Sequence, residues 1–290
     1  MRICNDCPRL CGVDRTKQKG YCGCSDDITV ALITLHRFEE PIISGKGGSG
    51  AVFFGGCNLK CVYCQNGAIS VEQSGKVYSE EELVSAMLKL QNDGADNINL
   101  ITATHFISSV QKALKMVKPQ LKIPVIYNCG GYESVNSLKM LDGLVDVYLP
   151  DFKYYDDELA LKYSFAPHYR ETALSAIREM CRQQSETVIE NGLIKKGVVI
   201  RHLVLPSHRQ DSMRVIDLIA DNFPTVKVSI MRQYTPAFNR STYKNLDRRI
   251  TSFEYDSVVA RAIERGLDGY IQQSGCENEK FTPDFIKFMR

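Results

Sequence analysis

The chain has 290 residues, of which 44% are hydrophobic, and a formal net charge of +2. This length supports one barrel-sized domain with a small additional module. The near-neutral charge argues against a surface that coats nucleic acid, and no apolar run approaches the ~20 residues of a membrane span. The first residues lack the apolar segment of a secretory signal, so we expect a cytoplasmic protein that contacts neither membrane nor nucleic acid.

The first 25 residues are rich in cysteine and poor in apolar side chains. The cysteines are Cys4, Cys7, Cys11, Cys22 and Cys24. Such a segment cannot build a core of its own, so we expect a metal to hold it together. The expected ligands are Cys4, Cys7, Cys11 and Cys22, with Cys24 as a spare or an alternative. Structural zinc or mononuclear iron and an auxiliary iron–sulfur cluster both suit this spacing, and disulfides are a third interpretation.

Residues 26–50 form a connector. A strand is expected at 28–35, followed by a glycine-rich stretch at 44–50. These glycines do not spell a phosphate-binding loop, because Lys46 precedes the later ones, and we interpret them as a turn before a strand. Glu39 and Glu40 are interpreted as an ordinary solvated pair.

Three cysteines follow the apolar run 51–54 in the pattern C-x3-C-x2-C: Cys57, Cys61 and Cys64. Thiolates in so tight a loop suit an iron–sulfur cluster. Three ligands for four irons leave one iron open to a substrate or a cofactor. A zinc site would close its shell with a fourth ligand, but the next cysteine is Cys129. The pattern therefore predicts a 4Fe–4S cluster.

This loop, with Tyr63 directly before the last cysteine, resembles the cluster loop of radical S-adenosylmethionine (SAM) enzymes. Residues 53–66 are especially similar to activating enzymes of the pyruvate formate-lyase type and to a branch of their homologues, a likeness that runs from Cys4 to about Tyr255. It implies that the open iron binds SAM, which is cleaved reductively to methionine and a 5′-deoxyadenosyl radical that abstracts hydrogen. Cys57, Cys61 and Cys64 are then catalytic as well as metal-binding.

From residue 51 the chain alternates strands and helices, the pattern of a parallel α/β sheet. Strands are expected at 52–54, 97–101, 123–127, 145–149, 197–205 and 226–231, and helices at 79–90, 106–117, 133–141, 171–182 and 211–222. Ser79 and Glu82 form a capping box at the first helix. Six such units match the α/β fold that the resemblance implies, a partial (β/α)6 TIM-like barrel with its chemistry at the carboxyl ends of the strands.

Candidate SAM-binding residues therefore follow the strands. Thr102, Thr104 and His105 stand where most family members carry Gly-Gly-Glu to hold the methionyl amino group. Their hydroxyls and neutral imidazole accept hydrogen bonds but lack a carboxylate's charge, and His105 as a cap of the next helix is the alternative. Asn128 is placed beside cofactor or substrate, and Tyr63 joins the set from the cluster loop.

The resemblance also assigns Asp151 and Lys153 to SAM. It implies that the Asp151 carboxylate binds the ribose hydroxyls or the methionyl ammonium of SAM, and that Lys153 binds the methionyl carboxylate. An internal Asp–Lys ion pair is the alternative. Arg201 is expected to face the methionyl carboxylate, while its neighbour His202 is structural because adjacent strand residues face opposite sides. Cys129 is interpreted as a buried small hydrophobe. Gln233 and Tyr234 either contact the adenine or close the barrel.

These expectations divide the chain into a cysteine-rich metal module with its connector (1–50), the partial barrel (51–240) and a C-terminal extension (241–290) with a helix at 255–265. The Phe-rich tail either covers the open barrel edge or contacts a partner.

The favoured function is activation of a glycyl radical enzyme, a protein substrate, with a flavodoxin- or ferredoxin-type reductant. The alternatives are radical chemistry on a small molecule, peptide or other macromolecule, and an iron–sulfur electron carrier without SAM.

Overall fold

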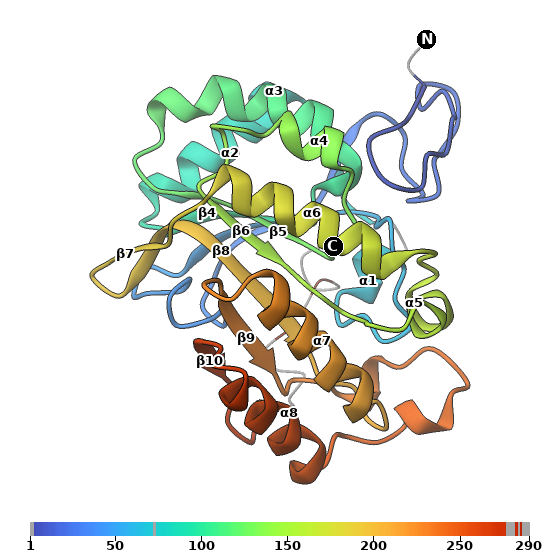
Figure 1. Ribbon diagram of the computed structural model, residues 1–290. Helices are drawn as coiled ribbons and strands as arrows, with labels where there is room; N and C mark the ends of the chain where they lie inside the picture. Colours follow the sequence, from blue (N-terminus) through green and yellow to red (C-terminus); the bar gives the residue numbers. More distant parts are fainter. Residues whose placement is uncertain (1–2, 72–73, 277–281, 284, 286–290) are drawn as a thin grey trace.

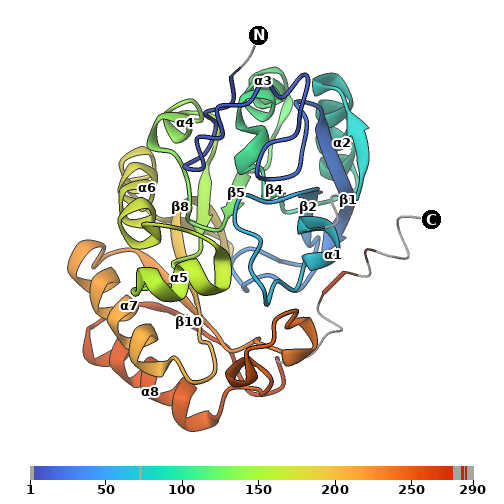
Figure 2. The ribbon, with the colours of Figure 1, turned by 90° about the vertical axis from the view of Figure 1, so that its right-hand side faces the viewer.

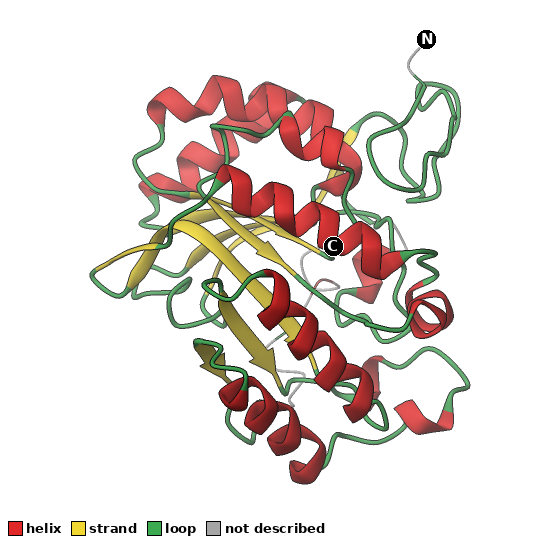
Figure 3. Ribbon diagram, viewed as in Figure 1, coloured by secondary structure: helices red, strands yellow, loops and turns green. Residues whose placement is uncertain are grey.

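The computed structural model describes residues 3–71, 74–276, 282–283 and 285 of the chain. Its centre is a curved sheet (Figures 1 and 3). Neighbouring strands follow the order β10-β9-β8-β6-β5-β4-β2-β1-β3, with β7 paired to β8. The strands are β1 (Ile28–His36), β2 (Ser49–Phe54), β3 (Lys76–Tyr78), β4 (Asn97–Ile101), β5 (Val125–Cys129), β6 (Val147–Pro150), β7 (Val188–Glu190), β8 (Leu193–Leu203), β9 (Lys227–Met231) and β10 (Gly269–Ile271).

Six consecutive strands, β2, β4, β5, β6, β8 and β9, pair in parallel, each with the next. They are the six strands expected from the sequence, with ends that differ by a few residues. The sheet curls with helices along its outer face, as Figure 2 shows. The predicted partial barrel is therefore confirmed.

The helices are α1 (Gly67–Ser70), α2 (Glu80–Asn92), α3 (Ile107–Val117), α4 (Val135–Lys139), α5 (Asp157–Ser164), α6 (Tyr169–Gln183), α7 (Arg209–Asn222) and α8 (Ser252–Glu264). The predicted capping box is present at α2, where the Ser79 hydroxyl accepts a hydrogen bond from the Glu82 amide and the Glu82 carboxylate accepts one from the Ser79 amide. The short helix α5 was not expected; Asp156 caps it by accepting from the Glu158 amide. Within the described residues no helix combines the length and apolarity of a membrane span.

The sheet continues beyond the expected barrel boundaries at residues 50 and 240. β1 pairs antiparallel with both β2 and β3, and β10 adds in parallel to β9. In the tail, Phe285 is buried and its ring meets that of Phe53 edge-on, with centroids 5.3 Å apart. Phe281 and Phe288 lie outside the described residues. The connector and the extension thus supply strands at both ends of the barrel wall, and the division into three domains stays a prediction.

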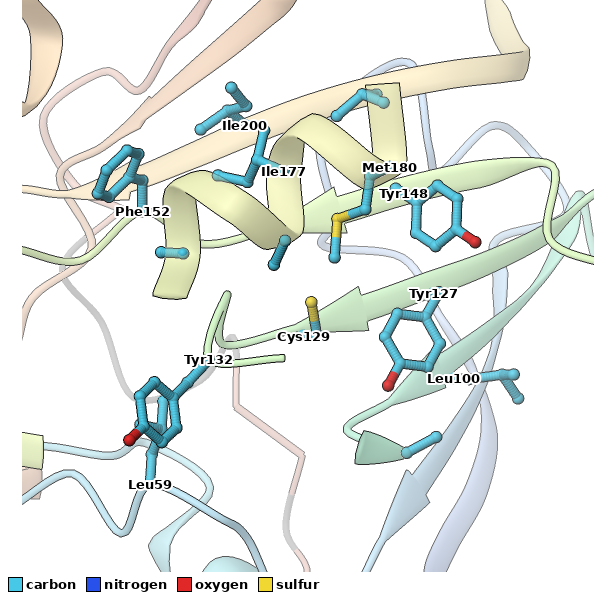
Figure 4. Close-up of a cluster of buried hydrophobic side chains, with 14 of the residues drawn as sticks. Leu59, Leu100, Tyr127, Cys129, Tyr132, Tyr148, Phe152, Ile177, Met180 and Ile200 are labelled. Atoms are coloured by element: carbon cyan, nitrogen blue, oxygen red, sulfur yellow. The ribbon is translucent and has the colours of Figure 1, made fainter. Parts of the chain in front are cut away.

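The main core lies between the parallel strands and the outer helices. Figure 4 shows Tyr127 and Tyr148 from neighbouring strands beside Ile177 and Met180 of α6, all fully buried. Cys129 lies in this cluster with an exposed fraction of 1%. Burial raises the pKa of the Cys129 thiol well above its usual value. The interpretation of Cys129 as a small buried hydrophobe therefore agrees with its surroundings.

The N-terminal segment 3–27 forms no helix, and its one bridge of strand type joins Ile3 to Asp14. Buried arginine contacts attach it to the barrel. Arg9 Nε donates to the carbonyl of Asn58 at 2.7 Å, and Arg15 donates to the carbonyl of His105. The segment therefore lies against the loop that carries Cys57, Cys61 and Cys64, at the same end of the sheet.

Candidate active site

The three-cysteine loop leaves β2 through a tight turn at Gly56, whose φ is +78°. A Cβ atom there would lie 2.4 Å from Cys24 Sγ and 2.8 Å from the Cys22 carbonyl oxygen. Glycine is required both for the left-handed backbone and for this close approach of the N-terminal segment. The loop and the segment are thus packed as one unit.

The three thiols line one cavity of about 160 Å³, called here the thiol cavity. Each sulfur accepts a hydrogen bond: Cys57 from the Leu59 amide at 3.4 Å, Cys61 from Ser164 Oγ at 2.9 Å and Cys64 from Ser70 Oγ at 3.6 Å. Donors of this kind suit thiolate ligands. Among the residues that the structure describes, no three Cys, His, Asp or Glu side chains are arranged to hold a metal ion.

A buried hydroxyl chain supports Cys61. The hydroxyls of Tyr63 and Tyr154 lie 2.5 Å apart, and Tyr154 Oη lies 2.7 Å from Ser164 Oγ, which donates to the sulfur. Ser164 is the last residue of α5 and is fully buried. The unexpected helix α5 therefore places a donor at the thiol cavity, and Tyr63 both lines the cavity and anchors the chain.

In the same cavity as the thiols, Asp151 lies between two cations. Arg201 Nε donates to Asp151 Oδ1 at 2.9 Å and Lys153 Nζ donates to Asp151 Oδ2 at 2.5 Å, while Arg201 Nη2 reaches Asn128 Oδ1 at 2.6 Å. Burial alone would raise the pKa of Asp151, but the charges of Arg201 and Lys153 outweigh it and hold that pKa below its usual value. All four residues line the thiol cavity.

The three candidate residues after β4 do not all lie at the thiol cavity. Thr102 lines the thiol cavity, whereas Thr104 and His105 do not. Thr104 Oγ1 donates to Glu133 Oε1 at 2.7 Å, and His105 Nε2 lies 2.7 Å from the Gly55 carbonyl oxygen. Burial lowers the pKa of His105 to about 4, which keeps the ring neutral. His105 accordingly supports the start of the cysteine loop, and it does not cap α3, whose N-cap is the next residue.

Adjacent residues of β8 face opposite sides, as expected. Arg201 points to the thiol cavity, whereas His202 is buried with Nδ1 2.7 Å from the Phe152 carbonyl oxygen. Gln233 and Tyr234, after β9, both line the thiol cavity. The parallel strands thus bring residues that are far apart in the sequence to one place.

The N-terminal cysteines gather on the other side of the loop. Cys4, Cys7, Cys22 and Cys24 are buried and Cys11 is partly so, and all eleven cysteines of the chain, each within the described residues, are free. The sulfurs of Cys11 and Cys22 lie 3.7 and 3.5 Å from the Cβ position at Gly20. The Tyr21 amide donates to Cys11 Sγ at 3.3 Å. The disulfide interpretation finds no support.

A larger cavity of about 450 Å³ adjoins the thiol cavity and shares Asn66, Asn128, Arg201 and Gln233 with it. Glu39 and Glu40 line the larger cavity but not the thiol cavity. The interpretation of these two residues as a solvated pair is wrong, because the Glu39 side chain is only 11% exposed and lies 3.5 Å from Arg201 Nη1. No periodic pattern in the sequence marks these two glutamates as site residues, because they reach the barrel from the turn after β1.

Residues 51–216 match the Radical SAM superfamily. An uncharacterized protein of Methanocaldococcus jannaschii, MJ0674, is 30% identical over 277 residues, which cover 91% of this chain and 75% of that protein. The pyruvate formate-lyase-activating enzyme of Clostridium pasteurianum is 25% identical over 247 residues, 80% of this chain and 96% of that enzyme.

Solved structures share the fold at low sequence identity. Streptococcus suis SuiB bound to the precursor peptide SuiA superposes with a TM-score of 0.54 at 10% identity, over 76% of this chain and 47% of SuiB. A radical SAM methyltransferase from Sphaerobacter thermophilus gives a TM-score of 0.54 at 12% identity, over 78% of this chain and 67% of that chain. The chain thus spans about half the length of SuiB.

Proposed function

Because the chain belongs to the radical SAM superfamily, we propose that Cys57, Cys61 and Cys64 hold its 4Fe–4S cluster in the thiol cavity. The donor set fits: three soft sulfur ligands, each with a hydrogen-bond donor, share one cavity with a buried group of charges. When bound, the cluster supplies the electron for the cleavage of SAM to methionine and a 5′-deoxyadenosyl radical. Membership of this family sets aside the electron-carrier interpretation.

The polar and charged residues that share the thiol cavity would hold SAM. Lys153 and Arg201 present cationic donors to the methionyl carboxylate, and Asp151 offers its carboxylate to the ammonium or the ribose hydroxyls. Thr102 and Asn128 line the same cavity and supply neutral polar contacts. Thr104 and His105 act from behind, where they hold Glu133 and the backbone of Gly55. The Asp151–Lys153 ion pair therefore becomes part of the cofactor site.

The observation that carries this proposal is the single cavity that brings three thiols together with Asp151, Lys153 and Arg201. The test is anaerobic: the protein is reconstituted with iron and sulfide, reduced and given SAM, and 5′-deoxyadenosine is quantified by mass spectrometry. We expect 5′-deoxyadenosine from the wild type and none from a variant with all three cysteines replaced by alanine. Equal product from both proteins would refute the assignment.

For the substrate, we propose a glycine of a partner protein, so that the chain activates a glycyl radical enzyme. The likeness to the Clostridium pasteurianum activating enzyme supports this choice, since it covers 96% of that enzyme. The electron would come from a flavodoxin or ferredoxin. A small molecule or peptide is the second candidate, and the larger cavity beside the thiol cavity favours it. Deuterium transfer from a labelled substrate into 5′-deoxyadenosine distinguishes the two.

Ser164 makes the first specific prediction. The variant S164A removes the hydroxyl that donates to Cys61 Sγ and leaves the Tyr154 hydroxyl without that partner. We expect the rate of 5′-deoxyadenosine formation to fall about 10–100-fold, the usual effect of losing a donor to a metal ligand. The matched control is S70A, whose contact with Cys64 is longer at 3.6 Å. An S164A rate within error of the wild type, with S70A more affected, would contradict this role.

We also propose a second metal site, zinc or iron, in the N-terminal segment, with Cys4, Cys7, Cys11 and Cys22 as ligands and Cys24 as the alternative to one of them. Its support is the burial of cysteines in a segment without helices and the position of the Cys11 and Cys22 sulfurs on one side of Gly20. In the variant that lacks the three loop cysteines, we expect residual metal by mass spectrometry, lost on C22S. A metal-free triple variant would disprove this site.

A further inference from the structure

The larger cavity is continuous with the proposed cofactor site. Asn66, Asn128, Arg201 and Gln233 line both cavities, whereas the thiols of the three-cysteine loop line only the smaller one. Its volume of about 450 Å³ lies within the range of sites for small ligands, ~300–1,000 Å³. Aromatic rings also line it, including Phe53, Phe238 and Tyr270. The cavity therefore has the position and size of a substrate site beside the cofactor.

The buried charges between the two cavities do not balance. Asp151, Glu39 and Glu40 bring three carboxylates, and Lys153 and Arg201 bring two cations. Arg201 is engaged by Asp151 at 2.9 Å and Asn128 at 2.6 Å, and its contact with Glu39 is the longest of the three at 3.5 Å. Arg37 also lines the larger cavity but is exposed. A buried acidic excess of this kind favours a cationic ligand.

Hydrogen-bond donors are also in short supply here. Asn99, which lies behind Glu39 and lines neither cavity, is fully buried and donates to Glu39 Oε1 at 3.2 Å, but its own Oδ1 accepts no hydrogen bond from the described residues. Glu40 Oε2 and Asn66 Oδ1 also accept no hydrogen bond from the described residues, and both Glu40 and Asn66 line the larger cavity. Buried acceptors are rarely left unsatisfied, so a ligand rich in N–H donors would complement this region.

Resting on the proposed radical function with its second candidate substrate, a small molecule or peptide, we propose that the larger cavity binds the substrate through a protonated amine or guanidinium group that pairs with Glu39. The substrate nitrogen donates to the Glu39 carboxylate, whose contact with Arg201 is the longest that Arg201 makes. The apolar part of the substrate lies along the aromatic rings. The remaining length reaches toward Asn128 and Arg201, the wall shared with the cofactor site. The cation belongs either to a free small molecule or to a lysine or arginine side chain of a peptide.

Calorimetry on the reconstituted holoenzyme with SAM, under anaerobic conditions, tests this proposal. The probes are n-butylamine and its uncharged counterpart n-butanol, and, for the peptide source, acetyl-lysine methylamide and acetyl-norleucine methylamide. We expect each cationic probe that binds to exceed its neutral counterpart in affinity by about tenfold or more. Binding of butylamine identifies a small-molecule source, and binding of the lysine derivative alone identifies a peptide. Neutral probes that bind as well as cationic ones, or no binding of any probe, would overturn the proposal.

Variants connect this preference to Glu39. E39Q is expected to abolish the preference for the cation, E39D to retain part of it, and the control E158Q, at an exposed glutamate of α5, to leave it unchanged. Iron content and melting temperature check that each variant folds. If E39Q does not fold, E39D still tests the proposal, since its preference must fall between those of the wild type and zero. An E39Q or E39D preference equal to that of the wild type would contradict the role of Glu39.

The pH dependence follows from the same carboxylate. Burial, reinforced by Glu40 and Asp151 and opposed by Arg201 and Asn99, raises the pKa of Glu39 to about 7. The affinity for butylamine, which stays protonated, should therefore rise between about pH 6 and 8 and level off above that range. If SAM is cleaved but no cation binds, this inference alone fails. If no 5′-deoxyadenosine forms while cations bind, the proposed function fails instead.

Discussion

The variant C61A forms 5′-deoxyadenosine at a rate more than about 100-fold below the wild type, because losing a metal ligand costs more than losing a donor to one. Cys61 is the best supported of the three thiols: it is buried and accepts the shortest hydrogen bond, from Ser164 Oγ at 2.9 Å. The iron content per chain of the C61A variant falls together with its activity. Both quantities are measured after anaerobic reconstitution.

The matched control for C61A is C181A, at a partly buried cysteine of α6 that lines neither cavity. We expect its iron content and activity to equal those of the wild type. If C61A kept full iron and full activity, Cys61 could not be a ligand of the catalytic cluster, and the assignment of the loop would be wrong.

The second large effect is expected for D151N. This change leaves Lys153 and Arg201 as buried charges without their carboxylate, so the free energy of unfolding should fall by about 3 kcal/mol. The dissociation constant of SAM should rise about 10–100-fold, the value of one hydrogen bond between charged groups. Iron content should stay unchanged, since Asp151 contacts none of the three thiols in the structure.

The stability effect of D151N has a defined pH dependence. The cations hold the pKa of Asp151 below its usual value, so its contribution is present above the unfolded pKa of about 3.9 and is lost as the pH falls through the folded pKa. The difference between the wild type and D151N should thus be constant above about pH 4 and shrink below it. The control is D142N, at an exposed aspartate that pairs with Arg182. Its free energy of unfolding should change by no more than about 0.5 kcal/mol. An equal loss in both variants would argue against a buried ion centre.

The sequence predicted much of this site because parallel strands obey simple rules. Residues at or just past the carboxyl ends of the strands, such as Asn128 and Asp151, meet at one end of a barrel, and the alternation along β8 sends Arg201 inward and His202 outward. Local signals such as the Ser79 capping box could be read directly. These features depend on residues close together in the chain or on a repeated pattern.

What the sequence could not give depends on contacts between distant segments. Glu39 reaches the barrel because β1 runs antiparallel to β2, which no periodicity reveals. Ser164 meets Cys61 across 103 positions of the chain, at the end of a helix too short to show an apolar repeat. His105 turns away from the thiol cavity because the Gly55 carbonyl oxygen is its hydrogen-bond partner. Residue type and spacing do not determine such partners.

The most direct test of the central claim is electron paramagnetic resonance of the reduced, reconstituted protein with and without SAM. Three cysteine ligands leave one iron of the cluster open, so SAM should change the spectrum of the wild type, and the D151N variant should need a higher SAM concentration for the same change. A cluster spectrum that SAM leaves unaltered, at a concentration that saturates the protein by calorimetry, would contradict the proposed cofactor site.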